Sequence, residues 1–207
     1  IENEIKMAKK YDFDILFLLG GTFTGVPAKD TSEDKMKGVL PRYLYKDYIM
    51  RGNNVVPPID AWERYVEFVV KNFDKDIKYY EVINEPGNGF LPEEYMKLQE
   101  AAYKIIKKYN PKAIVIGNGA TGDLGLRPLD WTKKLVALDH EKTLDMVAFH
   151  PYEASLDYQK GDYFKFTSIV NGLKELLNKN TKLFLTECYY LYSGTIKQGK
   201  TELSHYS

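Results

Sequence analysis

The sequence lacks the cysteine pairs of a disulfide framework, the histidine spacing of a metal centre and the long apolar run of a membrane span. It contains one cysteine, Cys188, and three histidines in 207 residues. A single cysteine cannot form an internal disulfide, and Cys188 directly follows an apolar strand, where a small buried side chain is a better interpretation than a nucleophile. The histidines show no ligand spacing, so we predict no metal. No apolar run reaches the roughly 18 residues of a membrane-spanning helix.

Net charge is also lacking. Lys and Arg together number 29, and so do Asp and Glu. This balance weighs, weakly, against a nucleic acid or an anionic membrane as partner. The chain begins without Met and inside a helical pattern, with no secretory signal, so we expect it to be part of a longer protein. Compartment and oligomeric state stay open.

What the sequence does have is enough apolar residues for a sizeable core and a high aromatic content. Hydrophobic residues make up 44% of the chain, with 17 Tyr and 10 Phe. Aromatic side chains build cores, and they also stack on the faces of sugars.

Helical and strand patterns alternate along the chain. Apolar spacing predicts helices near 1–11, 60–73, 93–109, 129–138 and 169–177, and strands at 14–19, 79–85, 113–117, 145–149 and 182–187. Asp60, with Glu63 three residues later, predicts an N-cap and capping box. Regular alternation with buried strands predicts an α/β fold with a parallel sheet. Residues 22–59 and the polar tail from Ser193 show no clear period, and 22–59 is interpreted as a long βα loop insertion in a single domain, 1–207.

Two architectures fit this alternation: an open doubly wound sheet and part of a (β/α)8 TIM barrel. Active residues in a barrel come from the ends of many strands, whereas an open sheet gathers them at one switch point. Here polar or glycine residues end almost every strand, which favours the barrel. A whole barrel needs about 250 residues. The five strands therefore predict an incomplete barrel.

Two of the strands end in glutamate. The run from Tyr80 to Ile83 is followed by Asn84, Glu85 and Pro86, and the run from Lys182 to Thr186 by Glu187. Pro86 cannot donate a ladder hydrogen bond, so the strand should stop near Glu85. Two carboxylates at the carboxyl ends of buried strands suggest the acid and the nucleophile or base of a glycosidase. A purely structural Glu85, capping a loop or pairing with a lysine, is the alternative.

Other strand-end residues are candidates for substrate contacts. Asn84 could hold a sugar 2-hydroxyl beside the acid. Tyr152 could donate to the nucleophile and keep it ionised. His150 could line the cleft, or it could be a strand-end histidine whose hydrogen bonds are all made within the protein. Asn118, which follows the strand at 113–117, is a further candidate substrate contact.

Residues Gly117 to Gly122 match the G-x-G-x-x-G pattern of dinucleotide sites and follow a strand. Gly125 and Pro128 continue the segment as loop, so no helix begins at the glycines. No acidic residue closes a following strand about 20 residues on. We therefore predict no organic cofactor, with a nucleotide-dependent oxidoreductase as the least favoured alternative.

Together these segments resemble the clan A glycoside hydrolases over about residues 13–192. The resemblance implies a retaining enzyme with Glu85 as acid/base and Glu187 as nucleophile, and it places the five strands at about positions 3 to 7 of the barrel. The segments Pro57–Trp62 and Tyr79–Val82 are similar to family 39, the β-xylosidase and α-L-iduronidase type. His150-Pro151-Tyr152 resembles the end of the sixth strand in such enzymes. A catalytically silent carbohydrate-binding barrel is the main alternative.

Overall fold

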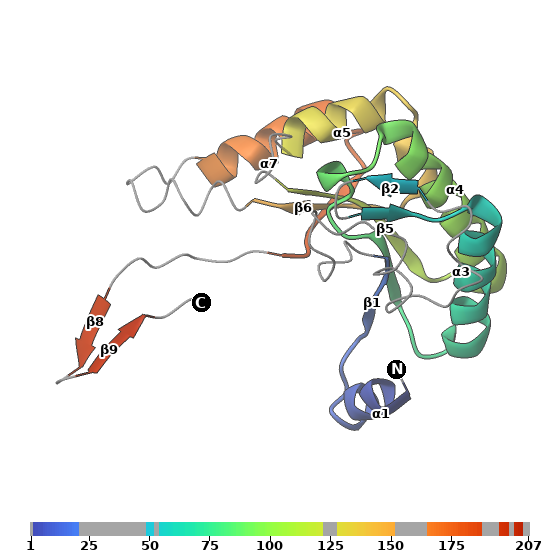
Figure 1. Cartoon of the computed structure of the whole chain (residues 1–207), viewed down its shortest axis with the longest axis horizontal. Coiled ribbons are helices and arrows are strands. Elements are labelled where there is room, and N and C mark those ends of the chain that lie inside the picture. Colours follow the sequence, from blue (N-terminus) through green and yellow to red (C-terminus); the bar gives the residue numbers. More distant parts are fainter. Residues whose placement is uncertain are drawn as a thin grey trace.

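Five parallel strands form the centre of the molecule (Figure 1). The computed structural model of the chain describes residues 2–20, 49–51, 54–121, 128–151, 165–187, 195–198 and 201–204. The strands lie in the order β1 (Leu16–Gly20), β4 (Tyr79–Ile83), β5 (Ile114–Thr121), β6 (Met146–His150) and β7 (Lys182–Leu185). Every neighbouring pair in this sheet is parallel.

The strand order distinguishes the two predicted architectures, because it follows the chain without reversal. With right-handed crossovers, such an order places every connecting helix on the same face of the sheet. Figure 1 shows one helical layer, which consists of α3 (Ile59–Phe73), α4 (Pro92–Tyr109), α5 (Pro128–Val136) and α7 (Lys165–Leu176). A doubly wound sheet would reverse its order at a switch point and carry helices on both faces. The predicted incomplete (β/α)8 barrel is confirmed.

Contacts across the face opposite these four helices show that the sheet is curved. Strands β4 and β7 are three positions apart, which is roughly 14 Å in a flat sheet. Yet the rings of Tyr79 and Phe184 have centroids 6.1 Å apart, and Thr186 Oγ1 lies 3.3 Å from Glu81 Oε1. We call this face, which carries Glu81 and Thr186, the inner face. Barrel curvature brings the inner-face side chains of distant strands together.

Apolar side chains fill the layer between helices and sheet. In α3 the buried positions repeat at helical spacing: Trp62, Val66, Val69 and Val70. Trp62 also donates its Nε1–H to the carbonyl oxygen of Leu98 at 2.9 Å, which joins α3 to α4. A second cluster joins α7 to β6 through Leu144, Val147, Phe149, Ile169, Leu173 and Leu177. Each fully buried aliphatic side chain of this size contributes about 1.5–3 kcal/mol to folding.

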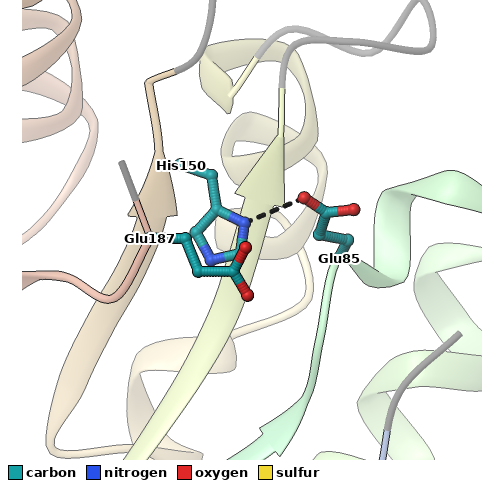
Figure 2. A group of neighbouring side chains, drawn as sticks. All are labelled: Glu85, His150 and Glu187. Atoms are coloured by element: carbon teal, nitrogen blue, oxygen red, sulfur yellow. Dashed lines mark hydrogen bonds and ion pairs between the residues drawn. The ribbon is translucent and has the colours of Figure 1, made fainter. Parts of the chain in front are cut away.

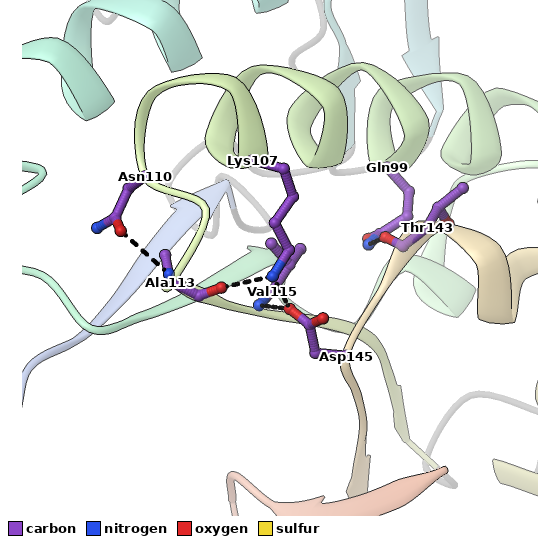
Figure 3. A network of polar contacts seen from close by, with 7 residues as sticks. All are labelled: Gln99, Lys107, Asn110, Ala113, Val115, Thr143 and Asp145. Carbon is purple, nitrogen blue, oxygen red and sulfur yellow. Dashed lines mark hydrogen bonds and ion pairs between the residues drawn. The ribbon is translucent and has the colours of Figure 1, made fainter. Parts of the chain in front are cut away.

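A polar network anchors α4 at the amino ends of β5 and β6 (Figure 3). Lys107 Nζ lies 2.6 Å from Asp145 Oδ2 and donates to the carbonyl oxygen of Ala113 at 2.7 Å. Asp145 also accepts the backbone N–H of Val115 at 2.7 Å. Two turns closer to the start of α4, the Gln99 side-chain amide donates to the Thr143 carbonyl oxygen at 2.7 Å. The carboxylate of Asp145 thus has both a cation and a backbone donor.

Several predicted details differ from the structure. The N-cap of α3 is Pro58 rather than Asp60, whose carboxylate lies in the first turn and pairs with Arg64 at 2.7 Å. The backbone N–H of Leu91 donates to Glu94 Oε2 at 3.0 Å, so the capping glutamate belongs to α4 instead. Pro58 has no hydroxyl or carboxylate for capping, so α3 begins without a side-chain cap hydrogen bond.

Short strands occur where the sequence shows no period. Residues 22–48 and 52–53 of the predicted insertion, 22–59, lie outside the described residues. The described remainder contains an antiparallel pair, β2 (Ile49–Arg51) and β3 (Asn54–Val56). A second pair, β8 (Thr195–Gln198) and β9 (Thr201–Ser204), lies in the tail. The first element of the chain is α1 (Glu2–Lys10), as predicted. Within the described ranges, no helix combines the length and the apolarity needed to cross a bilayer.

Candidate active site

Glu85 follows β4 directly, and its backbone is held in an unusual conformation. Its φ and ψ are 45° and 51°, in the left-handed region that non-glycine residues seldom occupy. Pro86 disfavours the right-handed helical alternative for the residue before it. The side chain is 18% exposed. A left-handed non-glycine residue costs on the order of 1–3 kcal/mol and occurs most often at functional sites.

His150, the last residue of β6, lies beside Glu85 and is completely buried. Its Nδ1 is 3.0 Å from Glu85 Oε1, and its Nε2 is 2.9 Å from Thr186 Oγ1. Both ring nitrogens therefore have a polar neighbour, one from the end of β4 and one from the end of β7. The imidazole bridges the two strand ends that carry the predicted catalytic glutamates.

Glu187 completes the group and is exposed at the end of β7 (Figure 2). One carboxylate oxygen each of Glu85 and Glu187 and one ring nitrogen of His150 all lie within 4.8 Å of one another. Figure 2 shows the three side chains pointing toward a common point from three strand ends. Two glutamates separated by 102 positions in the sequence thus meet at the carboxyl ends of the strands.

A third carboxyl group lies beneath this pair. Glu81, in the middle of β4, is only 5% exposed. Its Oε1 lies 3.3 Å from Thr186 Oγ1. Burial raises the pKa of Glu81 to about 7, and the charge of Glu187 adds to this effect, while His150 and the Thr186 hydroxyl oppose it. Glu81 is consequently a buried acid that changes its charge near neutral pH.

A bulge in β5 makes room for these carboxyl groups. The pairing of β5 with β6 shifts register between Gly117 and Ala120. Gly119 has φ +43°, and a Cβ there would lie 3.1 Å from the Ile83 carbonyl oxygen, 3.3 Å from Glu81 Oε1 and 3.3 Å from the Glu85 nitrogen. Only glycine combines this backbone conformation with so little space. The described glycines of the G-x-G-x-x-G match therefore lie within a strand that extends to Thr121, four residues beyond its predicted end.

The remaining predicted contacts have different outcomes. Asn84 is half-buried between β4 and Glu85, and its backbone N–H donates to the Gly20 carbonyl at 2.8 Å. Asn118 lies apart from the site: it is fully buried and donates its side-chain N–H to Thr132 Oγ1 of α5 at 2.7 Å. Tyr152 and Cys188 lie outside the described residues. The strand-end position of Asn118 does not reveal that its side chain turns toward the helices.

Glu81 and Thr186 are residues that the strand-end argument missed. A signal for Glu81 is present in the sequence, because it is the only charged residue in the apolar run from Tyr79 to Ile83. Burying a charge inside a strand is costly unless the group is paired or neutral. Thr186 has no comparable signal, since threonine is common in strands.

The trio in Figure 2 also raises the question of a metal ion, because three ligand-type side chains converge. Both ring nitrogens of His150 already lie at hydrogen-bonding distance from Glu85 and Thr186. A metal-bound histidine instead gives one ring nitrogen to the ion and the other to a supporting group. The hydrogen-bonding geometry of His150 therefore favours a polar network over a set of metal ligands.

Solved structures with this fold include several glycoside hydrolases. A monomeric β-xylosidase from Caulobacter crescentus CB15 superposes with a TM-score of 0.51 and 18% identity, over 68% of this chain and 33% of the xylosidase. For an endo-1,4-β-xylanase from Caldicellulosiruptor owensensis the TM-score is 0.59 with 13% identity, over 96% and 58% of the two chains. For the catalytic domain of an endoglucanase from Thermobifida fusca it is 0.52 with 15% identity, over 90% and 49%. No family model and no curated protein matches the sequence.

At these identities the likeness establishes the fold. The resemblance to clan A glycoside hydrolases that the strand-end motifs suggested is confirmed at that level. The chain spans 33% of the β-xylosidase and 58% of the xylanase.

Proposed function

We propose that the protein is a retaining glycoside hydrolase that cleaves O-glycosidic bonds of an oligo- or polysaccharide. The observation that carries the proposal is the approach of Glu85 and Glu187 to within 4.8 Å at the carboxyl ends of β4 and β7. Retaining glycosidases hold their two carboxyl groups about 5–5.5 Å apart, whereas inverting enzymes need about 6.5–9.5 Å to admit a water molecule. One carboxylate oxygen of Glu85 and one of Glu187 lie within 4.8 Å of each other, which supports the paired carboxylates of a glycosidase, and we assign the pair to the retaining class from the resemblance to clan A enzymes.

The surroundings of the two glutamates support different roles for them. Glu85 is mostly buried and lies 3.0 Å from His150, a group that can exchange a proton with it. Glu187 is exposed, so a sugar ring can reach it. In this proposal Glu85 protonates the leaving oxygen, Glu187 attacks the anomeric carbon, and Glu85 then takes a proton from the water that releases the sugar.

The fold neighbours suggest which substrates to try first. They include a β-xylosidase, endo-1,4-β-xylanases and an endoglucanase. A panel of aryl β-xylosides, aryl β-glucosides, xylan and a soluble cellulose derivative covers these activities at chain ends and within chains. A protein that binds one of these sugars and hydrolyses none would be the catalytically silent barrel.

The role of Glu85 is tested by the substitution Glu85→Ala in the full-length protein. Without the acid, we expect kcat for an alkyl-type glycoside to fall by about 10²–10⁴. A dinitrophenyl glycoside, whose leaving group needs no proton, should lose much less in its first step. The measurement is a comparison of pre-steady-state rates for the two substrates.

Glu100→Gln is the matched control, because Glu100 is an exposed residue of α4 that pairs with Lys104 at 2.6 Å. Its rates should equal those of the unmodified protein. An equal loss for both substrates in Glu85→Ala would contradict the acid role. Unchanged rates would remove Glu85 from the mechanism altogether.

A further inference from the structure

The two-glutamate mechanism leaves one buried carboxyl group unexplained. Glu81 is 5% exposed and is connected to Glu85 by three successive polar contacts. Glu81 Oε1 lies 3.3 Å from Thr186 Oγ1, Thr186 Oγ1 lies 2.9 Å from His150 Nε2, and His150 Nδ1 lies 3.0 Å from Glu85 Oε1. We call these four residues the Glu81–Glu85 path.

The chemistry of the two middle residues limits how protons can be arranged along the path. A threonine hydroxyl has one proton to donate, and a neutral imidazole has one N–H. If Glu81 is ionised, the Thr186 proton points to it, and His150 must then donate Nε2–H to Thr186. A neutral ring in that state presents a bare Nδ1 to Glu85, which favours a protonated Glu85.

The opposite arrangement follows when Glu81 carries a proton and donates it to Thr186. The Thr186 hydroxyl is then free to donate to His150 Nε2. The neutral ring now carries its proton on Nδ1 and donates it to Glu85, which favours the ionised form of Glu85. Through Thr186 and His150, an ionised Glu81 therefore favours a protonated Glu85, and a protonated Glu81 favours an ionised Glu85.

We propose that Glu81 is a positioning residue that sets the protonation of Glu85 through Thr186 and His150, so that a proton held at one of the two carboxyl groups disfavours a proton at the other. The inference concerns the hydrogen-bonded groups themselves, and its use in catalysis rests on the proposed function. An acid/base residue must be protonated for the first half-reaction and ionised for the second. A second carboxyl group with the opposite preference would assist both states.

Several titratable groups surround Glu81 and affect the pH at which its carboxyl group changes charge. They come from four elements: Glu85 from the end of β4, His150 from β6, Glu187 from the end of β7 and Tyr95 from α4. Burial raises the pKa of Glu81 to about 7. The raised pKa favours a protonated Glu81 below neutral pH, which corresponds to the second of the two proton arrangements.

The test is a carbon-13 NMR titration of the full-length protein with labelled glutamate side-chain carboxyls, with the Glu81 and Glu85 signals assigned from the Glu81→Gln and Glu85→Gln variants. In the unmodified protein both signals should titrate in two steps, because each site responds to the other. In Glu81→Gln the side chain mimics the protonated acid, so the second step of the Glu85 signal should disappear and its midpoint should move to lower pH. Signals that ignore each other would overturn the proposal.

Thr186→Val separates the path from simple repulsion between charges. Valine keeps the shape of threonine and removes the hydroxyl, so adding Glu81→Gln in that background should no longer move the Glu85 midpoint. Thr186→Ser should restore the coupling. A full-sized shift in the valine background would mean that the two carboxyls interact through space alone, which contradicts the path. If Glu81→Gln does not fold, the comparison of Thr186→Val with Thr186→Ser decides the question.

The titration requires no substrate, so its outcome is independent of hydrolysis. Coupled signals in a protein that cleaves no glycoside would keep the path and reject the enzyme. Hydrolysis with uncoupled signals would do the reverse.

Discussion

The two ends of the sheet treat carboxyl groups in opposite ways. At the amino ends of β5 and β6, Asp145 accepts a backbone N–H from Val115 and pairs with Lys107. Towards the carboxyl ends, the described neighbours of the Glu81 carboxyl are the Thr186 hydroxyl at 3.3 Å, His150, Tyr95 and the carboxylate of Glu187, with no lysine or arginine among them. The first arrangement stabilises a charge, and the second makes a charge costly.

This difference matches the division of labour in barrel folds, where the amino-terminal face contributes stability and the carboxyl-terminal face carries chemistry. The strained backbone of Glu85, at φ 45°, lies at the second end as well. Strain and unfavourable charge persist where the rest of the fold compensates for them. The comparison predicts that substitutions at one end change activity and at the other end change the free energy of unfolding.

The largest effect is expected at the carboxyl end. Glu187→Gln keeps the size of the side chain and removes the proposed nucleophile, so kcat should fall by at least about 10³-fold. The free energy of unfolding should stay the same or rise slightly, since Glu187 is exposed and lies close to Glu85. Steady-state kinetics and urea unfolding on the same preparation test both parts. Loss of activity together with a large loss of stability would point to a structural role.

A smaller effect is expected from a buried histidine at the amino end. His140 is fully buried, neither of its ring nitrogens has a hydrogen-bond partner within the described part of the chain, and burial lowers its pKa to about 4. An unfolded histidine, with a pKa near 6.5, binds a proton first as the pH falls. The stability that neutral His140 gives is therefore present above pH 6.5 and is lost towards pH 4, by about 1.4 kcal/mol per unit.

Urea unfolding of the unmodified protein and His140→Leu between pH 4 and 7 isolates this contribution. As the pH falls from 6.5 towards 4, the free energy of unfolding of the unmodified protein should fall relative to that of His140→Leu. Glu81 has the opposite sign, because its raised pKa means that its contribution is lost as the pH rises towards 7. The variant comparison cancels the Glu81 term. A difference that does not change with pH would show that His140 is not held neutral.

The smallest effect is expected from Asp145→Ala, which removes an acceptor from Val115 and an ion-pair partner from Lys107. Hydrogen bonds to charged groups contribute about 1.5–3 kcal/mol, and partial exposure places this one near 2 kcal/mol. The control is Glu100→Ala, which removes the exposed ion pair with Lys104 on the same helix as Lys107. It should lower the free energy of unfolding by less than about 0.5 kcal/mol. Activity should survive in both variants. A loss of turnover in Asp145→Ala would break the division between the two ends.

Periodicity and strand-end chemistry predicted the βα alternation, the parallel sheet and the meeting of Glu85 with Glu187. These features depend on local pattern and on the rule that parallel strands share a carboxyl edge. The sequence did not reveal that Asn118 turns toward Thr132 or that Thr186 connects Glu81 to His150. Both depend on the β5 bulge and on sheet curvature, which arise from tertiary packing.

The anomeric configuration of the first product shows whether Glu85 and Glu187 act as a retaining pair. Proton NMR of the full-length protein acting on an aryl β-glycoside follows this configuration before the sugar equilibrates. If Glu85 and Glu187 act as a retaining pair, the β-anomer appears first. First appearance of the α-anomer, or no release of sugar from any glycoside in the panel, would contradict it.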